Sequence, residues 1–89
     1  MRDWKWDYNP SEEHLTGGLP VGVIAEVERI ATELAALGRD AELAGSRPED
    51  RPGGLRNFPL FGGRGFLQFL AVPGHECVYI CNIVWFGQT

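Results

Sequence analysis

The chain has 89 residues, 44% of them apolar and 11% aromatic, and a formal net charge of −4 at neutral pH. A chain of this length predicts one globular domain spanning residues 1–89. No stretch approaches the roughly 18 apolar residues of a membrane span. The N-terminus carries charges and aromatic residues where a secretory signal has an apolar segment. We therefore expect a cytoplasmic protein without a membrane partner.

The chain opens with a predicted strand and a short helical turn. Trp4, Trp6 and Tyr8 alternate with charged residues, and this period of two is typical of a half-buried strand. Asn9 is then the expected N-cap of a short helix, with Pro10 at the first helical position.

An amphipathic helix follows and is the strongest element of the pattern. From position 20 to 37, apolar residues recur every three or four positions, so one face of the helix is apolar. Gly38 is a suitable residue to end it. Residues 39–54 predict a loop, with a short helical extension possible through 41–44.

Three apolar runs close the chain, at residues 55–61, 65–72 and 77–86. Glycine and proline residues between them favour antiparallel hairpins. The last run is almost continuously apolar, which predicts a central strand, whereas Pro59 predicts that its own strand lies at an edge of the sheet or is bulged there. The helices should then pack on one face of a mainly antiparallel sheet and leave the other face open, an α+β arrangement.

The two cysteines and two histidines do not predict a disulfide or a metal site. Cys77 and Cys81 lie four apart in a predicted strand, so their Cα atoms should be about 13 Å apart. A disulfide needs Cα atoms within about 7 Å, so both should be free thiols. His14 and His75 show no zinc-type spacing, and we expect His75 to be solvated at a hairpin tip. No metal and no cofactor is expected.

Positive charge is concentrated in the second half of the chain. Residues 1–50 hold eleven acidic and five basic groups, whereas residues 51–89 hold one acidic and three basic groups. A two-residue turn at Gly62-Gly63 would let Arg56 and Arg64 lie with Gln68 on the open face of the sheet. Two guanidinium groups there could bind a phosphate or stabilise developing negative charge. The alternative is a solvated arginine pair that keeps the sheet soluble.

Several short motifs together resemble the RelE/ParE superfamily of toxins from bacterial type II toxin–antitoxin systems. They are an aromatic first strand ending at Tyr8-Asn9-Pro10, the helix start Leu19-Pro20, the strand entry Gly54-Leu55-Arg56, and the turn Gly62-Gly63-Arg64-Gly65. The resemblance covers about residues 4–86. It implies a compact RelE/ParE-like fold in the order β-α-α-β-β-β.

The resemblance also implies a function in the inhibition of translation. Nuclease members are ribosome-dependent endoribonucleases, or mRNA interferases, in which the 2′-hydroxyl of the RNA is the nucleophile. By position, Arg64 and Arg56 match the catalytic arginines that bind and polarise the phosphate. Arg51, Arg47 and Gln68 would be RNA-binding residues. Ribosome-bound mRNA would be the substrate, and a cognate antitoxin would neutralise the toxin.

Two alternative functions remain open. Nuclease members usually carry an arginine and a tyrosine or histidine after the last strand, and no ionisable side chain follows Trp85 here. A non-enzymatic ParE-like toxin that binds DNA gyrase would suit this difference and the acidic net charge. A non-toxic protein-interaction module is the other alternative. The many aromatic residues predict an interface in either case, with an antitoxin in a hetero-oligomer or with a second copy in a homodimer.

Overall fold

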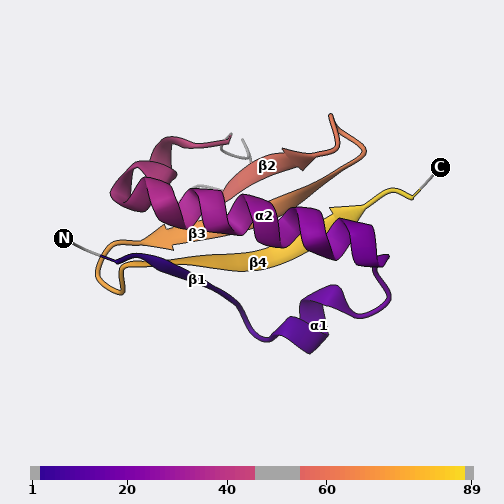
Figure 1. Ribbon diagram of the computed structural model, residues 1–89, viewed down its shortest axis with the longest axis horizontal. Coiled ribbons are helices and arrows are strands. Elements are labelled where there is room, and N and C mark those ends of the chain that lie inside the picture. The colour runs from indigo at the N-terminus through magenta and orange to yellow at the C-terminus, as the bar shows by residue number, and fades with distance from the viewer. Residues whose placement is uncertain (1–2, 46–54, 88–89) are drawn as a thin grey trace.

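The computed structural model describes residues 3–45 and 55–87. These residues form the strands β1 (Lys5–Tyr8), β2 (Arg56–Leu60), β3 (Gly65–Val72) and β4 (Cys77–Trp85). The helical segments are α1 (Glu12–Thr16), α2 (Val21–Leu37) and the 3-10 helix η1 (Gly38–Leu43). Figure 1 shows α2 lying along the sheet. The α+β class is therefore confirmed, as is the order of strands and α-helices along the chain.

The sheet is mixed, with the strand order β1-β4-β3-β2. β3 pairs antiparallel with both β2 and β4, whereas β1 runs parallel to β4. Two predictions about single strands hold. The apolar run near the C-terminus forms a central strand, and Pro59 lies in the edge strand β2, where its missing N–H group leaves no gap in the sheet interior.

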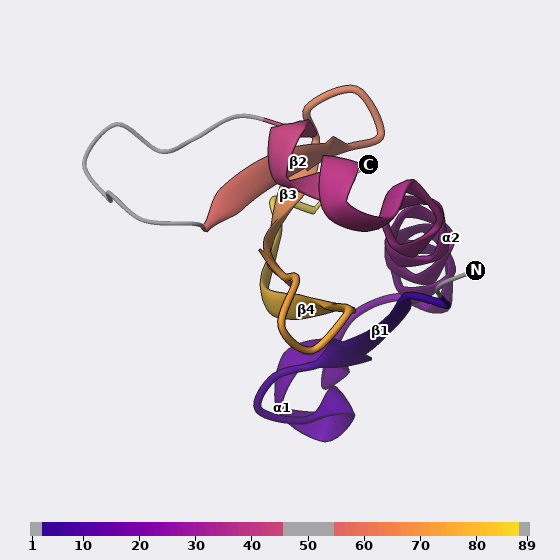
Figure 2. The same cartoon turned by 90° about the vertical axis from the view of Figure 1, so that its left-hand side faces the viewer.

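The hydrophobic core lies between α2 and one face of the sheet. Figure 2 shows α2 and η1 on this side, with α1 beside β1. The buried residues of α2 follow the predicted apolar stripe: Val23, Val27, Ile30, Ala31, Leu34 and Ala35. They meet fully buried strand side chains, of which the largest are Phe69, Leu60, Leu67 and Ile80. Each such side chain contributes roughly 1.5–3 kcal/mol through removal of its surface from water.

The strand register divides the sheet residues between two faces, because cross-strand partners point to the same side. We call the side beneath α2 the covered face and the opposite side the open face. Open-face residues include Asn57, Phe66, Gln68, Leu70, Tyr79, Asn82 and Val84. A β-bulge lies in β4, because Phe69 pairs with Ile80 and Gln68 with Asn82, which leaves Cys81 as an extra residue.

The start of α1 differs from the prediction. Ser11, not Asn9, is the N-cap, and its Oγ accepts a hydrogen bond from the backbone N–H of His14 at 3.2 Å. The N–H of Asn9 instead donates to the carbonyl of Ile80 at 2.9 Å. Asn9 therefore extends the β1–β4 pairing, so the helix starts after the sheet contact ends.

The chain after α2 is also more ordered than a plain loop. Gly38 ends α2 with φ 63°, a left-handed conformation that favours glycine, as expected from its position. The chain then continues as η1, in which Ala41 is fully buried. The possible extension through 41–44 is thus a 3-10 helix that already begins at Gly38.

The turn between β2 and β3 is longer than the predicted two residues. Leu60 pairs with Gly65, so Phe61, Gly62, Gly63 and Arg64 all belong to the turn. The carbonyl of Leu60 accepts hydrogen bonds from the N–H groups of both Gly63 and Arg64 at 3.0 Å. Phe61 and Arg64 therefore lie in the turn and do not pair as strand residues, but the register of β2 and β3 is the one that a two-residue turn at Gly62-Gly63 would also give.

Candidate functional site

The sequence predicted Arg56 on the open face, but the structure has it on the covered face. It pairs with Phe69, whose side chain is on the covered face. Its Nε donates to the carbonyl of Ala44, and one terminal nitrogen donates to the carbonyl of Gly45 at 3.2 Å. The half-buried Arg56 thereby ties the end of η1 to the edge strand. The guanidinium of Arg56 therefore stabilises the contact between these two segments.

Arg64 is exposed in the turn between β2 and β3. Its backbone carbonyl accepts a hydrogen bond from the N–H of Phe86 at 3.1 Å, which joins the turn to the residue after β4. Within residues 3–45 and 55–87, its side chain has no hydrogen bond or ion pair. The guanidinium is thus available to an external anion.

The two arginines are far apart along the sheet. Arg56 is opposite Phe69, which is five residues beyond Arg64 on the adjoining strand. At ~3.3 Å per residue this separates them by about 16 Å along β3. The structure therefore does not bring them together into one phosphate site. Arg47 and Arg51, the other predicted RNA-binding residues, lie outside the described residues.

Gln68 lies on the open face and is the centre of a row of amide side chains. Its Nε2 donates to Asn57 Oδ1 at 3.0 Å, and Asn82 Nδ2 donates to Gln68 Oε1 at 3.4 Å. The three residues are cross-strand neighbours on β2, β3 and β4. We call Asn57, Gln68 and Asn82 the amide row. Gln68 could be expected on this face from alternation along its strand, but the pairing with two other amides depends on strand order.

Half-buried apolar side chains flank the amide row. Phe66 and Val84 lie on one side of it, and Leu70 and Tyr79 lie on the other. The ring of Phe66 also approaches that of Phe86, with centroids 6.3 Å apart, and Phe86 is 67% exposed. The amide row and its flanking residues combine aromatic and aliphatic side chains with uncharged amides, and the centres of protein interfaces are likewise rich in aromatic residues and poor in charged ones.

A histidine–tyrosine pair lies at the turn between β3 and β4. His75 Nδ1 and the hydroxyl of Tyr79 are 2.8 Å apart, and their rings meet edge to face with centroids at 5.8 Å. Burial, with a smaller effect of the neighbouring Cys77 thiol, raises the pKa of Tyr79. His75 is exposed in the turn, as expected, but its contact with Tyr79 was not predicted. The spacing of four residues across a turn was the signal that could have indicated it.

The histidine–tyrosine pair and Arg64 are at opposite ends of the sheet. They are separated by the length of β3, which is seven residue steps or about 23 Å. A general acid or base must lie within hydrogen-bonding reach of the atom that it protonates. The pair therefore cannot act on a phosphate that Arg64 binds.

Both cysteines are free thiols, as predicted. Cys77 is fully buried, and its Sγ lies 3.6 Å from the carbonyl oxygen of Val78. Burial raises the pKa of both the Cys77 and the Cys81 thiol, so both are protonated at neutral pH. A protonated thiol is a poor nucleophile, and the cysteines are best explained as small apolar residues.

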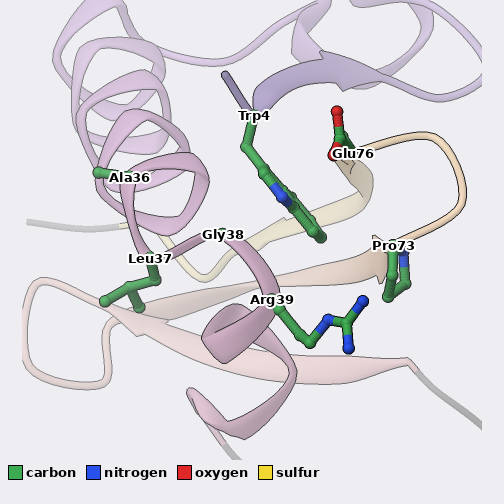
Figure 3. Close-up of a pocket in the computed structure, with 7 residues that line it drawn as sticks. All are labelled: Trp4, Ala36, Leu37, Gly38, Arg39, Pro73 and Glu76. Carbon is green, nitrogen blue, oxygen red and sulfur yellow. The ribbon is translucent and has the colours of Figure 1, made fainter. Parts of the chain in front are cut away.

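A pocket of about 390 Å³ lies at the opposite end of α2 from Pro20, where three segments distant in sequence meet. It is lined by Trp4, Ala36, Leu37, Gly38, Arg39, Pro73 and Glu76. Figure 3 shows the Trp4 indole within it, with Arg39 reaching toward Pro73 and Glu76 beyond the indole. This pocket could not be predicted from the sequence, because its walls come together only when β1 and α2 are both packed on the sheet.

Over the described residues, no group of three or more histidine, cysteine, aspartate or glutamate side chains could hold a metal ion. The helices in that same part of the chain are also too short or too polar to span a membrane. Comparisons with protein-family models, with curated proteins and with solved structures found no match to this chain.

Proposed function

We propose that this chain is a RelE/ParE-like toxin domain that acts by binding a protein through its open face, with DNA gyrase as the target that the resemblance implies. The observation that carries the proposal is the amide row flanked by apolar side chains, on a sheet face where no described helix packs. Such a toxin would work in the cytoplasm and would need no catalytic group of its own.

The arrangement of the ionisable groups supports binding over catalysis. Arg56 is hydrogen-bonded to two backbone carbonyls, so only Arg64 of the two predicted catalytic residues has an available guanidinium. The histidine–tyrosine pair lies at the far end of β3. An RNA-cleaving site needs charge stabilisation and proton transfer at one phosphate, which these positions do not supply together.

The charge of the chain also favours a protein over a nucleic acid as the target. A polyanion is bound mainly through lysine and arginine contacts to its phosphates, and the chain has a net charge of −4. On the open face the amide row is uncharged. The proposed antitoxin would cover this same face, because a neutralising partner must block the surface that reaches the target.

A ribosome-dependent endoribonuclease is the second candidate function. The observation that favours it is the exposed Arg64, whose guanidinium is available to a phosphate. In this candidate, Arg64 binds and polarises the scissile phosphate, and the ribosome orients the 2′-hydroxyl of the mRNA. Arg56 would then contribute only by holding the edge strand in place.

Growth after tightly controlled expression in a bacterial host distinguishes the two candidates. Leu70→Asp places a charge beside the amide row on the open face, whereas Arg64→Ala removes the available guanidinium. If the protein acts by binding, Leu70→Asp relieves growth arrest and Arg64→Ala does not. The arrest should come with DNA breaks and without new 5′ ends in translated messages.

Val21→Asp is the matched control, because Val21 is an apolar residue that is 82% exposed at the start of α2, away from the open face. Circular dichroism of each variant checks that the fold is retained. Loss of arrest in Arg64→Ala, together with new mRNA ends in the wild type, would support the nuclease instead. Growth without arrest on wild-type expression would contradict both toxin candidates and leave a non-toxic interaction module.

A further inference from the structure

The hydrogen bonds of the amide row have a fixed direction. The backbone N–H of Ile83 donates to Asn82 Oδ1 at 3.0 Å, so Asn82 Nδ2 is the group that turns toward Gln68. Gln68 Oε1 accepts from it at 3.4 Å, and Gln68 Nε2 in turn donates to Asn57 Oδ1 at 3.0 Å. A backbone group of β4 thereby orients three side chains across the sheet, because an amide carries its donor and its acceptor on different branches.

The two ends of the amide row therefore differ. At the β2 end, Asn57 Nδ2 donates no hydrogen bond to any of residues 3–45 and 55–87. At the β4 end, Asn82 Oδ1 accepts one hydrogen bond, from Ile83, and a carbonyl oxygen has two acceptor positions. The row thus ends in an available donor on one side and an available acceptor on the other.

A second copy of the chain offers the matching groups. A two-fold axis parallel to β3, in the plane between two facing sheets, places β2 of one copy over β4 of the other. Asn57 then faces the partner's Asn82, and symmetry forms the same contact twice. Facing sheets lie about 10 Å apart, which two asparagine side chains joined by a hydrogen bond can span.

The apolar residues beside the amide row also meet apolar residues in this arrangement. Phe66 and Leu70 lie on β3, so each faces its own counterpart across the axis. Pro59 on β2 and Val84 on β4 are both cross-strand partners of Phe66, so Val84 faces the partner's Pro59. Removal of these side chains from water favours association.

The charged residues of the open face lie outside this contact. Lys5 and Asp7 are on the open face because they pair with Cys77 and Tyr79, but β1 extends beyond β2 of the partner. Arg64 lies before the start of β3, at the rim. Each copy has a net charge of −4, so salt that screens the repulsion between copies should strengthen the contact.

The size of the contact predicts a dimer that dissociates readily. Three strands about 4.8 Å apart and about 25 Å long present a face of roughly 350 Å² on each copy. Two copies therefore bury on the order of 700 Å², which is typical of weak and transient contacts.

We propose that the open face binds a second copy of this chain in a reversible two-fold dimer, in which Asn57 donates to the partner's Asn82. The regulatory consequence rests on the proposed function. The dimer covers the face that binds the target, so only the dissociated chain acts.

The test is sedimentation equilibrium of the purified full chain, without a target, from about 1 μM to about 1 mM. The average mass should rise from 9.9 kDa toward twice that value, and added salt should not weaken the association. Asn57→Asp keeps the oxygen that accepts from Gln68 but replaces the outward donor with an acceptor, which repels the partner's Asn82. Its dissociation constant should be at least about tenfold higher than that of the wild type.

Val21→Asp is the matched control, because it adds the same charge on α2 at a position that is 82% exposed, and it should dimerise like the wild type. Phe66→Ala should weaken the dimer through its apolar part. Circular dichroism checks the fold of each variant. A wild type that stays monomeric, or Asn57→Asp that dimerises equally well, would overturn the proposal.

Growth after expression separates this inference from the proposed function. A monomeric wild type that still arrests growth would overturn the dimer alone. A wild type that dimerises in solution but causes no arrest would support the dimer and contradict the proposed function.

Discussion

The two faces of the sheet are formed by the same strands but differ in burial and in polarity. Phe69 and Gln68 are neighbours on β3, yet Phe69 is fully buried beneath α2, whereas Gln68 is half-buried in the amide row. The covered face contains no buried charged residue among those that the structure describes, since a charge there would lack water. On the open face, amides satisfy one another across three strands and remain close to solvent.

This comparison separates residues that stabilise the fold from residues available for binding. Changes on the covered face should lower the free energy of unfolding. Changes on the open face should alter binding with little effect on folding.

Loss of the Phe69 ring should have the largest effect. Phe69→Ala removes a fully buried side chain beneath α2 and should cost about 3–5 kcal/mol in the free energy of unfolding. Urea unfolding followed by circular dichroism measures this change. Phe66→Ala, on the open face of the same strand, is the control and should cost less than half as much. Should Phe69→Ala fail to fold, Phe69→Leu tests the same ranking, and equal costs at the two positions would contradict the division into faces.

A methyl group at Gly65 should have the next largest effect. Gly65 is buried at the start of β3, where an added Cβ would lie 2.4 Å from the carbonyl oxygen of Val84. Gly65→Ala should therefore cost about 1–3 kcal/mol through backbone displacement.

Gly22 provides the opposite case. It lies in α2, and an added Cβ has no neighbour within 4 Å, so Gly22→Ala should stabilise the protein by about 0.5–1 kcal/mol. Thermal unfolding of the two variants should shift the midpoint in opposite directions. A stable Gly65→Ala protein would mean that β3 and β4 separate easily at this end.

Alkaline pH should weaken the contact of Tyr8 with α2. The buried Tyr8 hydroxyl donates to Glu28 Oε2 at 3.0 Å, and burial together with this carboxylate raises the pKa of Tyr8. In the unfolded chain a tyrosine ionises near pH 10. Folding therefore holds the proton more tightly, and the stability from this group is complete below about pH 10 and is lost as pH rises above it.

The measurement is urea unfolding of the wild type and Tyr8→Phe from neutral to alkaline pH. Burial also raises the pKa of Tyr79 and of both thiols, so every variant should lose stability in alkali. The wild type should lose more than Tyr8→Phe. Parallel profiles for the two proteins would show that the Tyr8 hydroxyl does not contribute.

Replacement of Gln68 should have the smallest effect on folding. Gln68→Leu removes the hydrogen bonds to Asn57 and Asn82, but both asparagines remain near water on the open face. We expect a change within about 0.5 kcal/mol, as for other surface positions. Denaturant unfolding measures it. A loss of several kcal/mol would show that the amide row is part of the folding core.

Several elements were predictable because their signals are local. The stripe that begins at Val23 depends only on helical spacing, and it identified α2 and its buried face. β3 was predicted with its observed bounds, because glycine or proline residues lie directly beside both ends of an apolar run. The missing N–H group of Pro59 restricted its strand to an edge or a bulge, and the structure has it at the edge.

The candidate sites were predictable only in part, because they depend on which segments meet. The register about Gly62-Gly63 already puts Arg56 opposite Phe69 and on the other face from Gln68, so the face of Arg56 could have been predicted, whereas its bonds to the carbonyls after η1 could not, because they join nonlocal segments. The N-cap of α1 was predicted at Asn9 because no sequence signal shows that the sheet already uses the backbone of that residue. The pocket at Trp4 requires three segments whose contact is nonlocal.

Local patterns in the chain were enough to predict the type of each main element, the α+β class and the free state of both cysteines, because periodicity, turn residues and strand spacing act over a few residues. The three-dimensional arrangement was needed to show that β1 lies parallel beside β4, that Arg56 binds backbone carbonyls, and that Asn57, Gln68 and Asn82 form one row. These features arise from strand order and register, which depend on how the apolar faces of α2 and the sheet bury one another across the whole chain.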